Sequence, residues 1–243
     1  MRLVAGIEYQ GTNYCGWQRQ RTCPSIQAKV EAAFSEVADE PIQVACAGRT
    51  DRGVHALEQV VHFDTNALRS LDSWVLGGNA KLPPDIRIKW AKETTEAFHA
   101  RYSAIFRHYR YLIHNSSIPS ALMRNYTYWH RAPLNPVWMQ QGGNYLLGEH
   151  DFSSFRGAGC QAKSVNRNLF KLAVTVEAEI ISINLQANAF LLHMVRNIVG
   201  TLVKVGTGEK QPSWIAEVLQ TCDRRKAATT APAAGLYLVR IGY

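Results

Sequence analysis

The chain of 243 residues shows the same order of strand-like and helix-like segments twice. Apolar and polar residues alternate in the strand-like segments, whereas apolar residues recur every three or four positions in the helix-like ones. The first half reads strand, helix, strand, strand, helix, strand, which is the order of the ferredoxin-like, or split βαβ, unit. Its segments are residues 2–9, 26–37, 42–46, 59–63, 67–78 and 86–90.

Local signals place the ends of the two helices in the first half. Ser25 is expected to cap the first helix, because serine accepts hydrogen bonds from the first free backbone N–H groups. The second helix is expected to begin after Asn66, to turn Leu68 and Leu71 inward, and to end at residues 77–78, which are both glycine.

The second half repeats the pattern with one more helix. A proline at position 136 suits the first turn of a helix, and Ser213 suits an N-cap. The pattern predicts an α+β fold of two similar β-α-β-β-α-β (ferredoxin/RRM-like) halves, residues 1–100 and 101–243, around an extended antiparallel sheet with a central basic cleft. The expected strands are residues 104–114, 170–177, 181–187 and 236–241, and the long helix is residues 190–205.

Charge and composition favour a polyanionic partner. Lysine and arginine number 27 against 19 aspartates and glutamates, a formal net charge of +8, and nucleic acid is the commonest partner of such a chain. The five cysteines are scattered and form no C-x-x-C pair, so neither a disulfide framework nor a metal site is expected. We therefore expect the protein to work in a reducing compartment, the cytoplasm. The most apolar segment, residues 190–205, contains three basic side chains, so no membrane span is expected.

A charged loop at residues 47–56 (AGRTDRGVHA) lies between two expected strands. Gly48 and Gly53 bracket it, and glycine permits a left-handed backbone or the close approach of another chain. Asp51 stands between two arginines and is expected to be ionised at neutral pH. A hairpin turn with a surface ion pair remains an alternative, since exposed pairs are common and weak.

Two further stretches carry candidate functional residues. In the strand of residues 105–112, Arg107, Tyr109 and Tyr111 share one face, which suits RNA bases that stack on aromatic rings, although an ordinary half-buried strand would look the same. Arg196 falls on the apolar face of the long helix, where a guanidinium needs an anion unless its head reaches solvent.

At these stretches the sequence resembles the TruA-type tRNA pseudouridine synthases, nearly from end to end. Gln10 and Ala189 stand where the family has aspartate and glycine, and neither position touches the expected chemistry. The matching stretches are residues 11–18 (GTNYCGWQ), 47–56, 61–65 (VHFDT), 82–86 (LPPDI), 98–101 (FHAR), 107–111 (RHYRY), 148–152 (GEHDF), 194–200 (MVRNIVG), 230–232 (TAP) and 235–238 (GLYL).

The resemblance implies isomerisation of uridine to pseudouridine at positions 38, 39 and 40 in the anticodon stem-loop of tRNA. It implies Asp51 as the catalytic nucleophile and Arg196 as the cation that pairs with it. Tyr109 would stack on the uracil, Arg49 would fill the gap that the target base leaves, and Leu236 would pack under the tyrosine. It also implies a homodimer, and no metal, nucleotide or other cofactor, because an isomerisation has no use for redox or phosphoryl chemistry.

Two other classes of function remain open on the sequence alone. One is a non-catalytic RNA-binding or RNA-chaperone protein on the same fold, for which Asp51 would be dispensable. The other is a hydrolytic base glycosylase that uses Asp51 and releases free uracil, whereas an isomerase releases nothing.

Overall fold

The structure is a computed structural model that describes residues 1–243, and it contains two compact units. Unit 1 comprises Met1–Ile105 and Tyr237–Tyr243, and unit 2 comprises Phe106–Leu236. Each unit combines helices with a mostly antiparallel sheet, so the α+β class is confirmed. The chain's last strand clusters with unit 1, although the sequence analysis assigned all of residues 101–243 to the second half. None of the helices is long and apolar enough to span a bilayer.

In unit 1 the strands run in the order β4 (Ile86–Thr94), β1 (Arg2–Tyr9), β3 (His55–Asp64) and β10 (Leu236–Gly242). β1 is antiparallel to both of its neighbours, whereas β10 pairs with β3 in parallel, and the short β2 (Ala45–Cys46) lies on β3. Because side chains alternate along these strands, one face can carry a continuous core.

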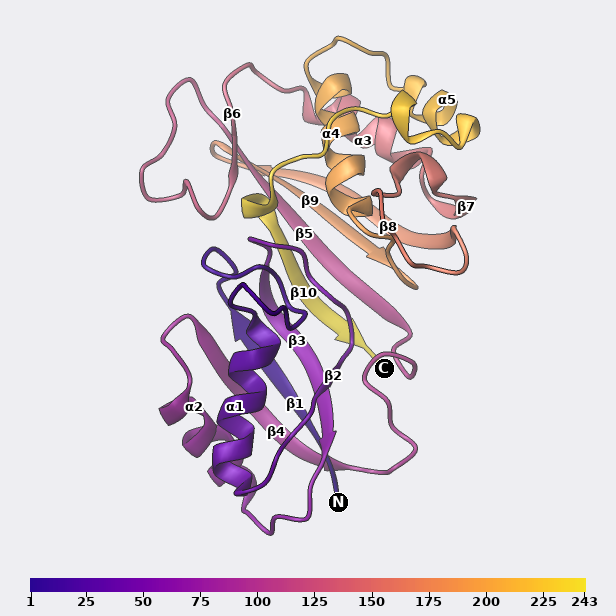
Figure 1. Ribbon diagram of the computed structural model, residues 1–243. Coiled ribbons are helices and arrows are strands. Elements are labelled where there is room, and N and C mark those ends of the chain that lie inside the picture. Colours follow the sequence, from indigo (N-terminus) through magenta and orange to yellow (C-terminus); the bar gives the residue numbers. More distant parts are fainter. The chain divides into compact units, whose positions relative to one another are not determined.

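Helices cover one face of the unit 1 sheet (Figure 1). They are α1 (Ile26–Ala38), the π-helical turn η1 (Ser73–Gly77) and α2 (Gly78–Lys81). As predicted, Ser25 caps α1, with its Oγ accepting from the Ala28 N–H at 3.4 Å. The core beneath contains Phe34, Phe63 and Trp74, whose rings contact one another and are almost completely buried.

In unit 2 the strands run in the order β5 (Phe106–Asn115), β9 (Ile180–Ala187), β8 (Asn166–Glu177) and β7 (Gly148–Asp151), all antiparallel, while β6 (Tyr128–His130) pairs in parallel with β5. Figure 1 shows α3 (Pro136–Asn144), α4 (Met194–Gly206) and α5 (Trp214–Thr221) gathered near β8 and β9. Three 3₁₀ turns complete the unit: η2 (Ser153–Phe155), η3 (Arg224–Lys226) and η4 (Ala233–Gly235). The strands β6 and β7 were not expected. That the two halves of the chain are repeats of one β-α-β-β-α-β unit stays a prediction.

The second helix of unit 1 differs from its prediction. Leu68 and Leu71, expected inside, are 87% and 39% exposed, and the fully buried side chain is Trp74. Helical structure also continues through Gly78 to Lys81. Gly78 does not end a helix; a β-carbon there would collide with the Ile88 side chain, so the glycine allows close packing. Of the strand expected at residues 42–46, only Ala45–Cys46 forms.

Two predictions for unit 2 are also corrected. The long helix begins at Met194 and not at residue 190, because His193 adopts a left-handed backbone with φ 59° and occupies the N-cap position. Tyr111, expected on a face that stacks with bases, is fully buried, and its hydroxyl donates to the Pro232 carbonyl at 2.6 Å. Burial raises the pKa of Tyr111 well above its usual value, with the Arg196 charge opposing the shift.

Candidate active site

The loop that carries Asp51 connects β2 to β3 and is closed by two backbone hydrogen bonds, one to β3 and one within the loop. The Ala47 N–H donates to the Val60 carbonyl at 2.8 Å, and the Val54 N–H donates to the Asp51 carbonyl at 3.2 Å. Gly53 has φ 78°, a left-handed conformation that glycine adopts without cost. Asp51 is partly buried within this turn, and Arg49 is exposed.

The segment before α1 holds the Asp51 loop from behind. The Trp17 N–H donates to the Thr50 carbonyl at 3.0 Å, and the hydroxyls of Tyr9 and Thr50 lie 2.8 Å apart. Gly16, with φ 90°, lies so close that a β-carbon would come within 2.5 Å of the Thr50 carbonyl oxygen and 2.9 Å of the Asp51 carbonyl carbon. The backbone of residues 50–51 is therefore fixed by main-chain contacts.

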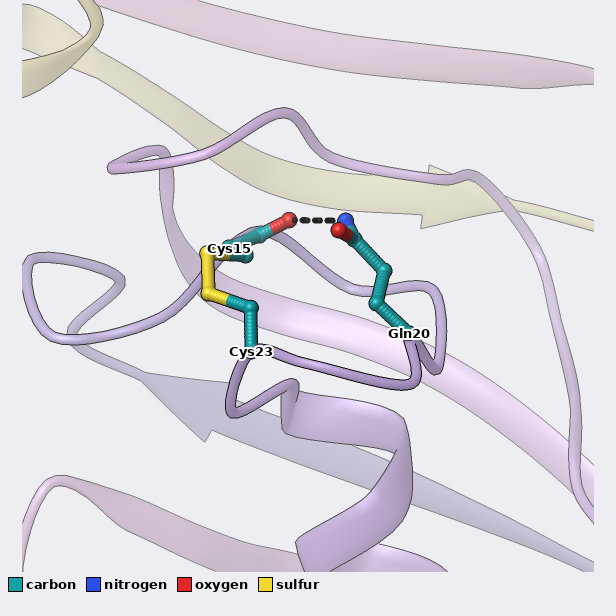
Figure 2. Close-up of a disulfide and its surroundings, with 3 residues drawn as sticks. All are labelled: Cys15, Gln20 and Cys23. Atoms are coloured by element: carbon teal, nitrogen blue, oxygen red, sulfur yellow. Dashed lines mark hydrogen bonds between the residues drawn. A yellow bond between two sulfur atoms is a disulfide. The ribbon is translucent and has the colours of Figure 1, made fainter.

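A disulfide closes this supporting segment (Figure 2). Cys15 and Cys23 are joined with their α-carbons 6.0 Å apart, and the Gln20 side chain donates to the Cys15 carbonyl at 3.0 Å. The prediction that no cysteines pair was therefore wrong, because a turn between the two residues brings them together and their spacing alone does not reveal it. One of the observations behind the expected reducing compartment is thereby removed.

Cys46 is a nucleophilic side chain close to the loop that the sequence analysis did not consider. Burial raises the pKa of its thiol to about 11, with the Arg49 charge opposing the shift. A thiol is a nucleophile only when deprotonated, so Cys46 stays inert near neutral pH.

Arg196 lies in the first turn of α4 and contacts the segment of residues 223–231, which we call the strap. Its Nε donates to the Ala231 carbonyl at 2.8 Å, and the Ala231 N–H donates to the Arg196 carbonyl at 3.1 Å. One turn along the helix, a β-carbon on Gly200 would collide with the Thr229 carbonyl. The strap thus lies directly against the helix backbone.

Tyr109 is positioned by the centre of β5, opposite Leu185 of β9. Its side chain is 8% exposed, and its ring meets the edge of Phe190 at a centroid distance of 5.1 Å. Leu236, at the start of β10, is 5% exposed. The tyrosine is thus held by an aromatic neighbour from the segment that leads into α4.

The structure distributes the expected site residues over the two units. Arg49 and Asp51 share one loop of unit 1, and Tyr109, Arg196 and Leu236 belong to unit 2. Sequence reasoning missed the residues that support them. Behind Asp51 these are Tyr9, Trp17 and Thr50, and around Arg196 they are Asn197, Arg224 and Thr230. The only signal for them was that four of the six fall in stretches shared with the family, residues 11–18, 47–56, 194–200 and 230–232.

Comparisons with known proteins identify the family of the chain. A family model described as "tRNA pseudouridine synthase" matches residues 5–103 and 144–243. Proteins named tRNA pseudouridine synthase A are 52% identical over 242 residues in Coxiella burnetii, 53% over 241 in Hydrogenovibrio crunogenus and 51% over 243 in Vibrio parahaemolyticus. These alignments cover 99–100% of this chain and 92–93% of the relatives. The chain belongs to the tRNA pseudouridine synthase family.

Among solved structures, the archaeal box H/ACA sRNP Nop10-Cbf5 complex aligns over 83% of this chain and 43% of that chain. Its TM-score is 0.39 and its sequence identity 10%, a likeness too slight to bear on function.

Proposed function

We propose that this chain converts uridine to pseudouridine at positions 38, 39 and 40 of tRNA, with Asp51 as the catalytic nucleophile. The observation that carries the proposal is the Asp51 loop, whose backbone is fixed by Trp17 and Gly16 in a chain of this family. A fixed backbone presents a carboxylate in one position, which is what attack on a single carbon requires.

The reaction breaks the N1–C1′ bond, turns the uracil, and joins C5 to C1′. The proton on C5 leaves and N1 gains one, so the product is an isomer of the substrate. The Asp51 carboxylate serves either by forming an ester with C1′ or by assisting removal of the C2′ proton toward a glycal. Both routes need the target nucleotide outside the RNA stack, and unstacking it costs roughly a few kcal/mol.

The other site residues take roles around that step. Arg196 pairs with the Asp51 carboxylate, Tyr109 stacks on the uracil and accepts the C5 proton, and Leu236 packs under the tyrosine. Arg49, which is exposed on the same loop as Asp51, fills the space left in the stem. A homodimer that acts in the cytoplasm belongs to the proposal and rests on the family resemblance; sedimentation velocity tests the dimer.

The decisive experiment uses unmodified tRNA transcripts that carry tritium at uridine C5, which is released to water only when C5 loses its hydrogen. We expect Asp51→Asn to lower turnover by about 10⁴-fold. RNA binding, measured by filter retention, should persist because phosphate contacts supply most of the affinity. The matched control is Asp72→Asn, an exposed aspartate whose side chain caps no helix, and it should leave turnover unchanged.

The same assay separates the other classes of function. A hydrolytic glycosylase would release free uracil, which chromatography detects, and a chaperone would release no tritium even as wild type. Near-normal turnover of Asp51→Asn would refute the assignment of the nucleophile. Transcripts that keep a single uridine at position 38, 39 or 40 test the target positions.

Arg196→Ala tests the second charged group. We expect slower turnover and a less stable protein, because the Nε–H bond to the Ala231 carbonyl is lost. One such bond contributes about 1 kcal/mol, which corresponds to a fall in Tm of about 2–4 °C for a chain of this size. Equal melting temperatures for the wild type and Arg196→Ala would show that the bond to the Ala231 carbonyl does not stabilise the fold.

A further inference from the structure

We infer that Arg224, together with Asn197 and Thr230, positions the Arg196 guanidinium, so that these three side chains act in the reaction through Arg196. The inference rests on the proposed role of Arg196 and adds residues to which no part in the reaction has been assigned. It depends only on contacts inside unit 2.

Asn197 is the centre of the network. Its side chain is completely buried next to Arg196, and its Nδ2 donates to the Phe155 carbonyl at 2.7 Å. Its Oδ1 accepts two hydrogen bonds, from Thr230 Oγ1 at 2.6 Å and from Arg224 Nη2 at 3.0 Å. Both lone pairs of the amide oxygen are therefore used, which fixes the orientation of the side chain.

Arg224 closes the network from the strap side. Its Nη2 also donates to Thr230 Oγ1 at 3.1 Å, and its Nη1 donates to the Ala227 carbonyl at 3.3 Å. These acceptors are uncharged oxygens, and burial lowers the pKa of Arg224. Arg224 is partly withdrawn from water and binds only amide and hydroxyl oxygens. Its contribution is therefore to fix the positions of these groups and not to neutralise a negative charge.

The strap transmits this geometry to Arg196. Thr230 is the residue before Ala231, whose carbonyl accepts from Arg196 Nε and whose N–H donates to the Arg196 carbonyl. Because Nε is committed to the strap, a carboxylate cannot use the fork formed by Nε and one Nη. A bidentate carboxylate is then restricted to the edge formed by the two Nη atoms, and the position of Ala231 influences where that edge points.

The test compares neighbouring arginines of η3. Arg224→Met removes the contacts to Asn197 and Thr230, and Arg225→Met removes an equal charge from an exposed side chain bonded to Asp223. We expect Arg224→Met to lower kcat about 10- to 100-fold, the loss expected when a reacting group is misplaced by about 1 Å. KM should stay unchanged, and Arg225→Met should keep the wild-type kcat.

A double-mutant cycle distinguishes positioning from general structural damage. In an Arg196→Ala background, measured in single turnovers with excess enzyme, Arg224→Met should cause no further loss, because the group it positions is gone. A further loss equal to the one in the wild type would overturn the inference. A rise in KM with kcat unchanged would instead make Arg224 an RNA contact and would overturn it as well.

Thr230 supplies a second test in case Arg224→Met fails to fold. Thr230→Val keeps the shape and loses the hydroxyl, whereas Thr230→Ser keeps the hydroxyl. We expect a lower kcat for valine and wild-type kcat for serine, and equal values for the two would overturn the inference. If Arg196→Ala itself turns over normally, the proposed role of Arg196 fails; if it is slow while Arg224→Met and Thr230→Val are not, only the positioning inference fails.

Discussion

The Asp51 loop and the first turn of α4 both have backbone contacts, but they differ in how much polar side chains add to them. Around Asp51 the contacts run from backbone to backbone: the Trp17 N–H bonds to the Thr50 carbonyl, and Gly16 touches residues 50–51 directly. Around Arg196 the backbone bond from the Ala231 N–H to the Arg196 carbonyl is joined by a network of side chains, those of Asn197, Arg224 and Thr230. A β-carbon added at Gly16 or at Gly200 would collide with a carbonyl oxygen, so both regions should be sensitive to it. The region of Arg196 should depend more than the Asp51 loop on polar side chains.

Gly16→Ala should have the largest effect, and it tests the main-chain contact between Gly16 and residues 50–51. The new methyl group would lie 2.5 Å from the Thr50 carbonyl oxygen on a residue with φ 90°. We expect a loss of at least about 3 kcal/mol in the free energy of unfolding from overpacking and left-handed strain together. Turnover should fall about 100-fold as Asp51 shifts. Denaturant unfolding and the tritium-release assay measure both.

Gly148→Ala is the matched control. Gly148 has nearly the same φ, 96°, but its β-carbon would meet only the His150 ring at 3.8 Å. Only the left-handed strain remains, about 1–2 kcal/mol, and turnover should stay normal. Equal losses for the two variants would mean that the Asp51 loop moves aside easily.

Removal of the Cys15–Cys23 disulfide tests whether the position of the Asp51 loop also depends on this crosslink. The bond joins residues eight apart, and closing so short a loop stabilises a fold by about 2 kcal/mol. The replacement of both cysteines by serine should therefore lower Tm by about 4–8 °C, whereas Cys222→Ser, at an exposed free thiol, should not.

Turnover of the Cys15→Ser/Cys23→Ser variant should change little, because the Trp17 and Gly16 contacts to residues 50–51 do not involve sulfur. A parallel loss of turnover and stability would place a side-chain crosslink among the supports of Asp51. The contrast between the two regions would then be weaker than the contacts indicate.

The sequence predicted what depends on short-range pattern. The alternating strands that became β1, β5, β8 and β9 were found, as were the cap at Ser25 and the proline in the first turn of α3. Ser213 occupies the N-cap position of α5, but its side chain makes no capping hydrogen bond. The loop of Asp51 was found because it lies between alternating strands and carries glycines. Prediction failed where long-range packing decides: Gly78 packs on Ile88 and does not end a helix.

The supporting contacts of the candidate site could not have been read from local pattern. Arg224 and Asn197 are 27 positions apart, and nothing in the spacing of an arginine and an asparagine predicts that they share a hydrogen bond. The two cysteines of the disulfide are close in sequence, but only the turn between them makes the bond possible. Resemblance to a family made Asp51 and Arg196 candidate site residues, but it gave no information on the atoms that orient them.

The two regions should also differ, by a smaller amount, in how their stability depends on pH. In β3, which follows the Asp51 loop, His62 is buried and its Nδ1 accepts from the Ala100 N–H at 3.1 Å. Burial and the nearby His99 lower the pKa of His62 below 6.5. The unfolded chain thus takes up a proton that the folded protein resists, so the stabilisation present above pH 6.5 is lost as the pH falls through the folded pKa.

We expect unit 1 to lose stability between pH 7 and pH 5, seen as weaker protection of the β3 amides against hydrogen exchange once the intrinsic pH dependence of exchange is divided out. His62→Gln should flatten that dependence, and His150→Gln, which alters a histidine whose ring bonds to the Leu147 carbonyl, should leave it. Asn197, Thr230 and Arg224 have no side chain that titrates in this range, so the protection factors of the Asn197 and Ala231 amides should stay constant. An equal loss of protection in β3 and at these amides would show that acid opens both regions together, in which case the Asp51 loop and the first turn of α4 are not independently stable.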